Sequence, residues 1–280
     1  MKLRTLIRIA VIVSIVLLCT GFGVYSFLRM NAVENRQDFN LFTLVPQDAT
    51  AVLETDRMAD LMEDIDGLHC SKDEHFLYVS ELFVYLKKYF NTLVGDTPHG
   101  LSRQMNKMLI SFHEPDTPLN QVLYCSLGAG DYELVESFVR KYCSSTFPSK
   151  YFDYNGEEIR IYPTADGRFL AAYFTPDFLA VSFQKRLIEQ VIDAQLDGRS
   201  LSKDTVFESL HHNKSSRFMT FYGRTASVPL LTGKRDYCWS EFDLHMNSEV
   251  IYLNGAMAGP EACMPVSYTH LRAHETLSDL

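Results

Sequence analysis

Hydrophobic and polar positions alternate in two different rhythms along the chain, and each rhythm predicts a set of elements. A period of 3.6 residues predicts helices over 58–65, 76–94, 134–142, 187–196 and 204–210. Alternation or short apolar runs predict strands over 50–55, 107–113, 121–127, 217–222 and 248–258. Strands interleaved with helices indicate an α+β domain.

The segment from 151 to 183 gives the clearest local pattern. Asn155-Gly156 and Asp166-Gly167 each separate two strand-like runs, and Thr175-Pro176-Asp177 separates the third from the fourth. Asn-Gly and Asp-Gly adopt positive φ at low cost, as tight hairpin turns require. We therefore predict a four-strand antiparallel meander near 151–183.

One uncharged, mostly apolar run covers residues 9–28. About 20 helical residues cross a hydrocarbon layer of roughly 30 Å. Lys2, Arg4 and Arg8 precede the run, so the positive-inside tendency keeps residues 1–8 in the cytoplasm. The run predicts a single transmembrane helix that contacts the lipid bilayer.

Two alternatives stay open for this run. Gly21 and Gly23 are small residues at which a signal peptide could be cut, and Cys19 could carry a lipid. Each alternative still exports the rest of the chain. We expect a tether over 29–45 and an extracytoplasmic α+β domain over 46–265 in the periplasm, held at the bacterial inner membrane.

Composition agrees with a folded domain and argues against one class of partner. Hydrophobic residues make up 46% of the chain and the formal net charge is -9. Because phosphate binding needs a basic stripe, this balance argues against a nucleic-acid partner.

Residues 266–280 have the sequence VSYTHLRAHETLSDL. The stretch over 266–276 resembles the translation of a widely used sequencing adapter. We therefore expect a non-native tail over 266–280, with the native sequence truncated near Pro265. His270 and His274, with Glu275 beside them, have a spacing that would suit a metal on a helix, but the resemblance argues against that reading.

Candidate chemistry is sparse. His113, Glu114 and Asp116 lie at the end of a predicted strand and are the best acid–base candidates, although Pro115, Asp116 and Pro118 are also ordinary turn residues. His211 and His212 end a predicted helix, where the helix dipole favours histidine and a metal is the alternative. Cys125 and Cys143 are candidates for a disulfide. No cofactor motif is visible in the sequence.

The sequence also resembles a bacterial family of membrane-anchored proteins catalogued as a domain of unknown function, number thirty-three fifty-two. The resemblance is carried by VPQDATAVLETD (45–56), FLAVSFQKRLIEQVIDAQL (178–196), LSKDTVFESL (201–210) and RFMTFY (217–222). It implies an envelope protein and transfers no catalytic residue.

These patterns favour an uncharacterised membrane-anchored protein that acts as a non-catalytic binding or assembly module. Its partners would be envelope proteins or cell-wall material. The alternatives are a membrane-tethered hydrolase that uses His113, and a small-ligand carrier with an apolar pocket.

Overall fold

The chain forms two compact units, Met1–Asp38 and Phe39–Leu280. The structure is a computed structural model. It describes residues 20–25, 39–61, 82, 85–87, 89, 92, 104–115, 117, 119–128, 130–143, 148–164, 167–211, 219–224, 238–246, 250–259, 262–267 and 271–272.

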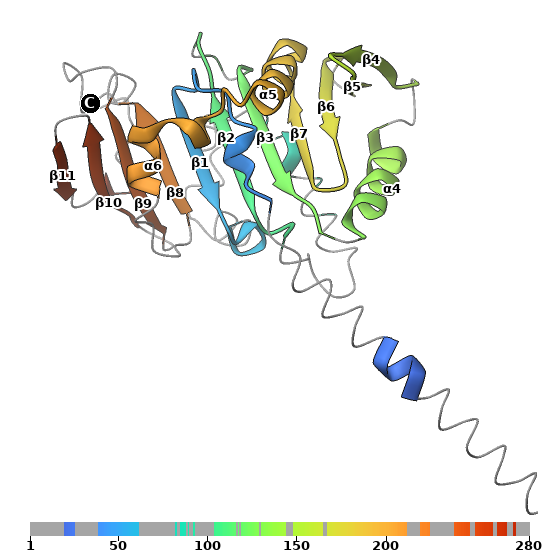
Figure 1. Cartoon of the computed structure of the whole chain (residues 1–280), viewed down its shortest axis with the longest axis horizontal. Coiled ribbons are helices and arrows are strands. Elements are labelled where there is room, and N and C mark those ends of the chain that lie inside the picture. Colours follow the sequence, from blue (N-terminus) through green and yellow to red (C-terminus); the bar gives the residue numbers. More distant parts are fainter. Residues whose placement is uncertain are drawn as a thin grey trace, which may run out of the picture. The chain divides into compact units, whose positions relative to one another are not determined.

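One antiparallel sheet dominates the second unit (Figure 1). Its strands are β1 (Ala51–Thr55), β2 (Met108–Phe112), β3 (Gln121–Ser126), β4 (Lys150–Tyr154), β5 (Glu157–Pro163), β6 (Phe169–Phe174), β7 (Phe178–Ser182), β8 (Met219–Arg224), β9 (Trp239–Met246), β10 (Val250–Gly259), β11 (Ala262–Ser267) and β12 (Leu271–Arg272). The order is β11-β10-β9-β8-β1-β2-β3-β7-β6-β5-β4, and β12 pairs with β10.

The predicted meander is confirmed, because β4, β5, β6 and β7 pair in sequence order. Its first turn places Asn155 at φ 54° and Gly156 at φ 85°. Two successive positive φ values match the twist of the flanking strands. The turn therefore fixes the register in which Tyr154 pairs with Glu157.

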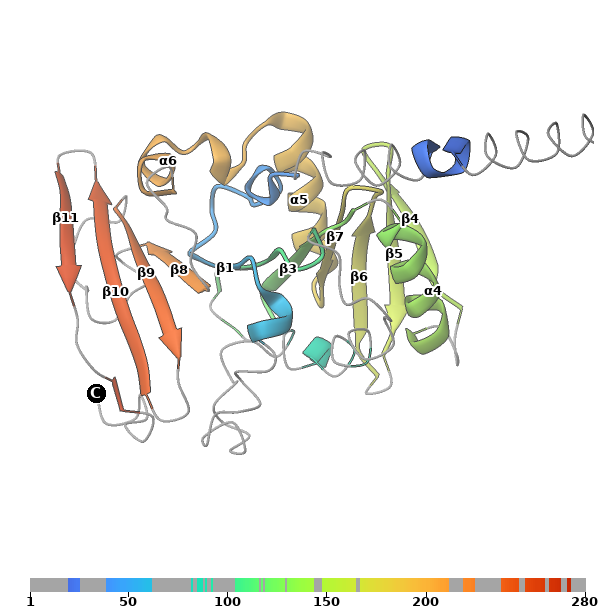
Figure 2. The same cartoon turned by 90° about the horizontal axis from the view of Figure 1, so that it is seen from below.

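Side chains on both faces of the sheet are buried. On one face, Val52 and Val122 belong to the same core cluster as the helices α5 (Lys185–Asp197) and α6 (Thr205–His211). On the other, Met108 and Ile110 pack with Met58, from the short helix at residues 58–61, and with Leu82. Figure 2 shows α5 and α6 together on one side of the sheet. The helix α4 (Asp131–Cys143) lies near the β4 end.

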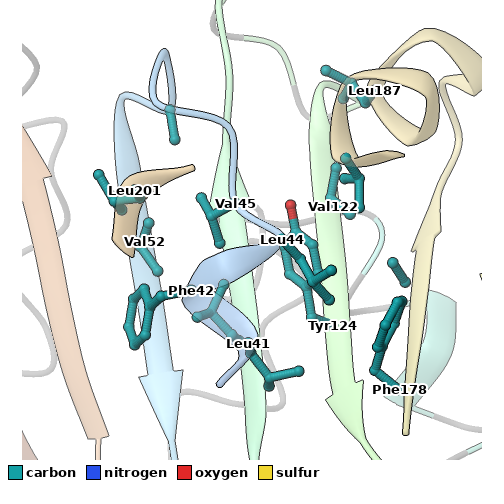
Figure 3. Packing of buried hydrophobic residues seen from close by; sticks show 14 of the residues in the cluster. Leu41, Phe42, Leu44, Val45, Val52, Val122, Tyr124, Phe178, Leu187 and Leu201 are labelled. Carbon is teal, nitrogen blue, oxygen red and sulfur yellow. The ribbon is translucent and has the colours of Figure 1, made fainter. Parts of the chain in front are cut away.

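A segment at residues 39–50, which we call the crossing segment, runs over the face that carries α5 and α6 (Figure 3). It contains the short 3-10 helix η1 (Leu41–Thr43), and Leu44 and Val45 are completely buried. The Leu201 N–H, in the 3-10 helix η3 (Leu201–Lys203), donates to the Val45 carbonyl at 2.7 Å. Residues 39–45, predicted as the end of a tether, thus belong to the folded unit.

The predicted fold class, α+β, is wrong, and the single transmembrane helix predicted with it falls mostly outside the described residues. The strands predicted as local hairpins join a single 12-stranded antiparallel sheet, and the described helices are few and short. Strand order is the physical reason: β1 pairs with both β2 and β8, which lie far away in sequence.

No helix among the described residues is long and apolar enough to span a membrane. Of the predicted span 9–28, the structure describes residues 20–25, which are helical. At ~1.5 Å per residue this piece covers about 9 Å. The predicted helix at 76–94 falls mostly outside the described residues.

Candidate functional site

His113 follows the end of β2 and faces a buried serine. Ser111 and His113 are two residues apart, so strand alternation places both on the same face of the sheet. The Ser111 hydroxyl lies 2.8 Å from His113 Nε2 and 3.1 Å from the Tyr124 hydroxyl on β3. Burial raises the pKa of Tyr124, so this phenol stays neutral.

The other side of the His113 ring faces the crossing segment. His113 Nδ1 lies 3.8 Å from Asp48 Oδ1, which is too long for a hydrogen bond, so we treat the contact as electrostatic. The His113 ring lowers the pKa of Asp48, and the charge of Arg224 acts in the same direction. Ser111, His113 and Asp48 therefore stand in the order of a serine hydrolase triad.

Access decides what this arrangement can do. Ser111 has an exposed fraction of 0% and His113 of 3%. A nucleophilic oxygen must reach a substrate carbonyl, and this hydroxyl is enclosed between the sheet and the crossing segment. We conclude that Ser111, His113 and Tyr124 form a buried polar network between β2 and β3, and that the Asp48 carboxylate connects it to the crossing segment.

Of the predicted acid–base candidates His113, Glu114 and Asp116, the structure describes the first two. Glu114 is exposed beside His113, and Asp116 lies outside the described residues. Glu114 and Pro115 lie in a turn, and the Asn120 side chain donates to the Pro115 carbonyl at 2.8 Å. The described part of this loop therefore has the turn structure that was the alternative to an acid–base site.

Asp48 makes the stability of the fold dependent on pH. A carboxyl group whose pKa is lower in the folded state stabilises the fold above its unfolded pKa, ordinarily 3.8. That contribution is lost as the pH falls through the lower, folded value. Because the side chain is 65% exposed, solvent screening limits the gain to about 1 kcal/mol or less.

We therefore expect Asp48→Asn to be slightly less stable than wild type at pH 7, with the difference shrinking as the pH falls below 3.8 and vanishing below the lower, folded pKa. Urea unfolding at several pH values measures this. Asp197→Asn removes an exposed charge that pairs with Arg199 and serves as the control. A difference that persists unchanged at pH 2 would contradict the assignment.

His211 lies at the end of α6 among aromatic rings. Its ring centroid is 4.5 Å from Phe42 and 5.8 Å from Phe207, and its Nε2 lies 3.9 Å from a Glu54 carboxylate oxygen. Aromatic faces supply no metal ligands. The part of the chain that the structure describes contains no group of three residues suited to a metal ion, and His212 lies outside that part.

Cys125 is a free cysteine, so the structure does not form the predicted pair with Cys143. The Cys125 side chain points into the core cluster with Met108 and Leu123, rather than toward a cysteine. Burial raises the pKa of this thiol to about 12. An inert, buried thiol is the result.

The sequence predicts the strand β4 but not its position at the edge of the sheet. This strand is the last in the order, among the strands that the structure describes. Tyr151 is 60% exposed and Phe152 is 42% exposed. The Arg160 guanidinium lies 5.8 Å from the Tyr151 ring, and the Lys185 ammonium lies 5.2 Å from the Phe152 ring. This edge offers backbone groups, aromatic surface and charge together.

Sequence signals for these features differ in strength. The i, i+2 spacing of Ser111 and His113 was visible in the sequence and implies a shared strand face. Asp48 lies 65 positions before His113, and no local pattern joins them. The edge position of β4 depends on the order of the whole sheet.

Comparisons with known proteins give little further information. No protein-family model matches the chain, and no curated protein matches it. The resemblance to family thirty-three fifty-two therefore stays a prediction. A solved structure titled "Structure of crystal form I of TP0453" is similar at a TM-score of 0.40 and 10% identity, covering 81% of each chain. At this level the similarity supports no functional argument.

Proposed function

We propose that the protein is a non-catalytic binding or assembly module of the bacterial envelope, and that the β4 edge is its binding surface. The observation that carries the proposal is the exposure of Tyr151 and Phe152 on an edge strand. Edge strands present unpaired backbone donors and acceptors to another chain. Strand addition at such an edge is a recurring mode of recognition.

Two features support a binding role over catalysis. The Ser111–His113–Asp48 arrangement would favour the hydrolase alternative, yet its serine is fully buried. Tyr151 and Phe152 on β4 are instead exposed to solvent, and tyrosine and phenylalanine are enriched where proteins bind one another. The small-ligand carrier stays a prediction.

The envelope location is part of the same proposal. The apolar run 9–28 and the basic residues before it support export of the residues that follow, with contact to the inner-membrane lipid. A topology reporter fused after Phe42 tests this. Activity of an exported reporter agrees with the proposal, and activity of a cytosolic reporter contradicts it.

Capture from bacterial envelopes tests the binding surface. We expect the tagged full-length chain to recover envelope partners, and Phe152→Lys to recover several-fold less because a charge is placed at the edge beside Lys185. Phe169→Lys is the matched control, since Phe169 is 61% exposed but lies on β6. Equal recovery by the two variants would contradict the proposal.

A further inference from the structure

The hairpin turn determines which backbone groups of β4 face outward. Tyr154 and Glu157 close the two-residue turn and form a hydrogen-bonded pair. In antiparallel pairs, residues alternate between hydrogen-bonded and non-hydrogen-bonded positions. The N–H and C=O groups of Tyr151 and Asp153 therefore point away from β5, toward the free edge.

We propose that this edge pairs with β4 of a second copy of the chain, antiparallel about a two-fold axis at Phe152. The inference rests on the proposed function and names the partner of the same edge. In this register Tyr151 of each copy forms a hydrogen-bonded pair with Asp153 of the other. Phe152 then faces Phe152 of the second copy across a non-hydrogen-bonded position, where side chains are closest.

Charge complementarity favours a second copy over an unrelated strand. The basic end of the β4–β5 hairpin carries the exposed Lys150, and its Arg160 is already paired with Glu158 of the same copy at 2.7 Å. The acidic end carries Asp153 and Glu157. An antiparallel two-fold arrangement places the basic end of each copy beside the acidic end of the other. Opposite charges on neighbouring strands stabilise such a pairing.

The same arrangement places a tyrosine, and not a third carboxylate, directly opposite Asp153. Asp153 faces Glu158 within one copy, so two carboxylates already lie opposite each other. Pairing brings Tyr151 of the second copy against Asp153, with Arg160 one strand further. The aromatic pair at the centre covers surface that is otherwise open to solvent.

The expected dimer is weak. A five-residue strand buries less surface than a standard interface, and small interfaces are typical of transient association. A disulfide cross-link at the two-fold axis is therefore a more sensitive test than a measurement of molecular mass. Only a residue close to that axis lies beside the same residue of the second copy.

We test this with Phe152→Cys in the full-length chain, in detergent micelles under mild oxidation. The matched control is Phe169→Cys, which places a thiol at a comparably exposed position away from the edge. Wild type gives the background from the native cysteines. We expect at least roughly tenfold more disulfide-linked dimer from Phe152→Cys, because pairing raises the effective concentration of the two thiols.

A charge swap separates pairing from misfolding. In the Phe152→Cys background, Lys150→Glu is expected to reduce the amount of dimer several-fold. The new carboxylate would lie near Glu157 of the other copy, with Tyr154 of that copy between them. Adding Glu157→Lys is expected to restore the dimer. Equal cross-linking by Phe152→Cys and Phe169→Cys, or no rescue by the swap, would overturn the dimer.

The outcome also distinguishes the two proposals. If the dimer is absent while Phe152→Lys still loses envelope partners, the edge binds a different protein and only the dimer is overturned. If the dimer is absent and Phe152→Lys recovers as much envelope protein as wild type does, the proposed binding function is overturned as well.

Discussion

Replacement of Phe42 by alanine is expected to lower the free energy of unfolding by about 3–5 kcal/mol, the range for large aromatic truncations in cores. Phe42 is 4% exposed in the crossing segment, and its ring contacts Phe207 at 5.1 Å and Tyr222 at 6.1 Å between centroids. The change leaves a cavity beneath the crossing segment that its neighbours cannot fill without moving the segment. Chemical denaturation followed by circular dichroism measures the loss.

Phe169→Ala is the control for this prediction, because it removes the same side chain from an exposed position. Exposed substitutions of this kind usually change stability by about 0.5 kcal/mol or less. If Phe42→Ala were no more destabilising than Phe169→Ala, the crossing segment would not be part of the core.

Trp239→Ala is expected to cost a similar ~3–5 kcal/mol, since it removes the largest buried side chain of the unit. The Trp239 ring lies 5.2 Å from Phe207 and 5.1 Å from the Arg224 guanidinium. Its indole N–H donates to Asp204, the residue that caps α6. The substitution therefore loosens β9, β8 and α6 together.

A second variant separates the ring from its hydrogen bond. Trp239→Phe keeps an aromatic ring against Phe207 but removes the donor to Asp204, and we expect a smaller loss of about 1–2 kcal/mol. Thermal unfolding of both variants gives the comparison. An equal loss from both would show that ring packing has no part in the effect.

Local turn chemistry made much of the sheet predictable. Asn155-Gly156 gave the first hairpin turn, and the positive φ of Gly198 ends α5 at the predicted place. Asp204 accepts from the backbone N–H groups of Val206 and Phe207, as expected for a residue that starts a helix. These features depend on neighbouring residues, so a sequence reading can find them.

The strand β9 was missed for a physical reason. It contains Glu241 and Asp243 at positions that face the core side of the sheet, and Asp243 is buried against Thr220 at 3.0 Å. A buried carboxylate interrupts the apolar alternation on which strand prediction depends. The Thr220 hydroxyl on β8 donates to this carboxylate and offsets part of the cost of its burial.

The candidate sites depended on contacts between distant segments. Ser111 lies on β2 and His113 directly follows it. Both are covered by the crossing segment, which lies more than 60 residues earlier in the chain, and this burial gives them a structural role. The edge position of β4 likewise follows from a distant pairing, that of β3 with β7, which leaves the meander ending at β4. Such long-range pairing carries no local signature.

The central claim, that this domain acts by binding and not by catalysis, is tested most directly by labelling with a fluorophosphonate probe. The full-length chain in detergent micelles is treated at neutral pH, and Ser111→Ala is treated in parallel. The account predicts no labelling of Ser111, because its hydroxyl is fully buried. Labelling that maps to Ser111 and disappears in Ser111→Ala would contradict it.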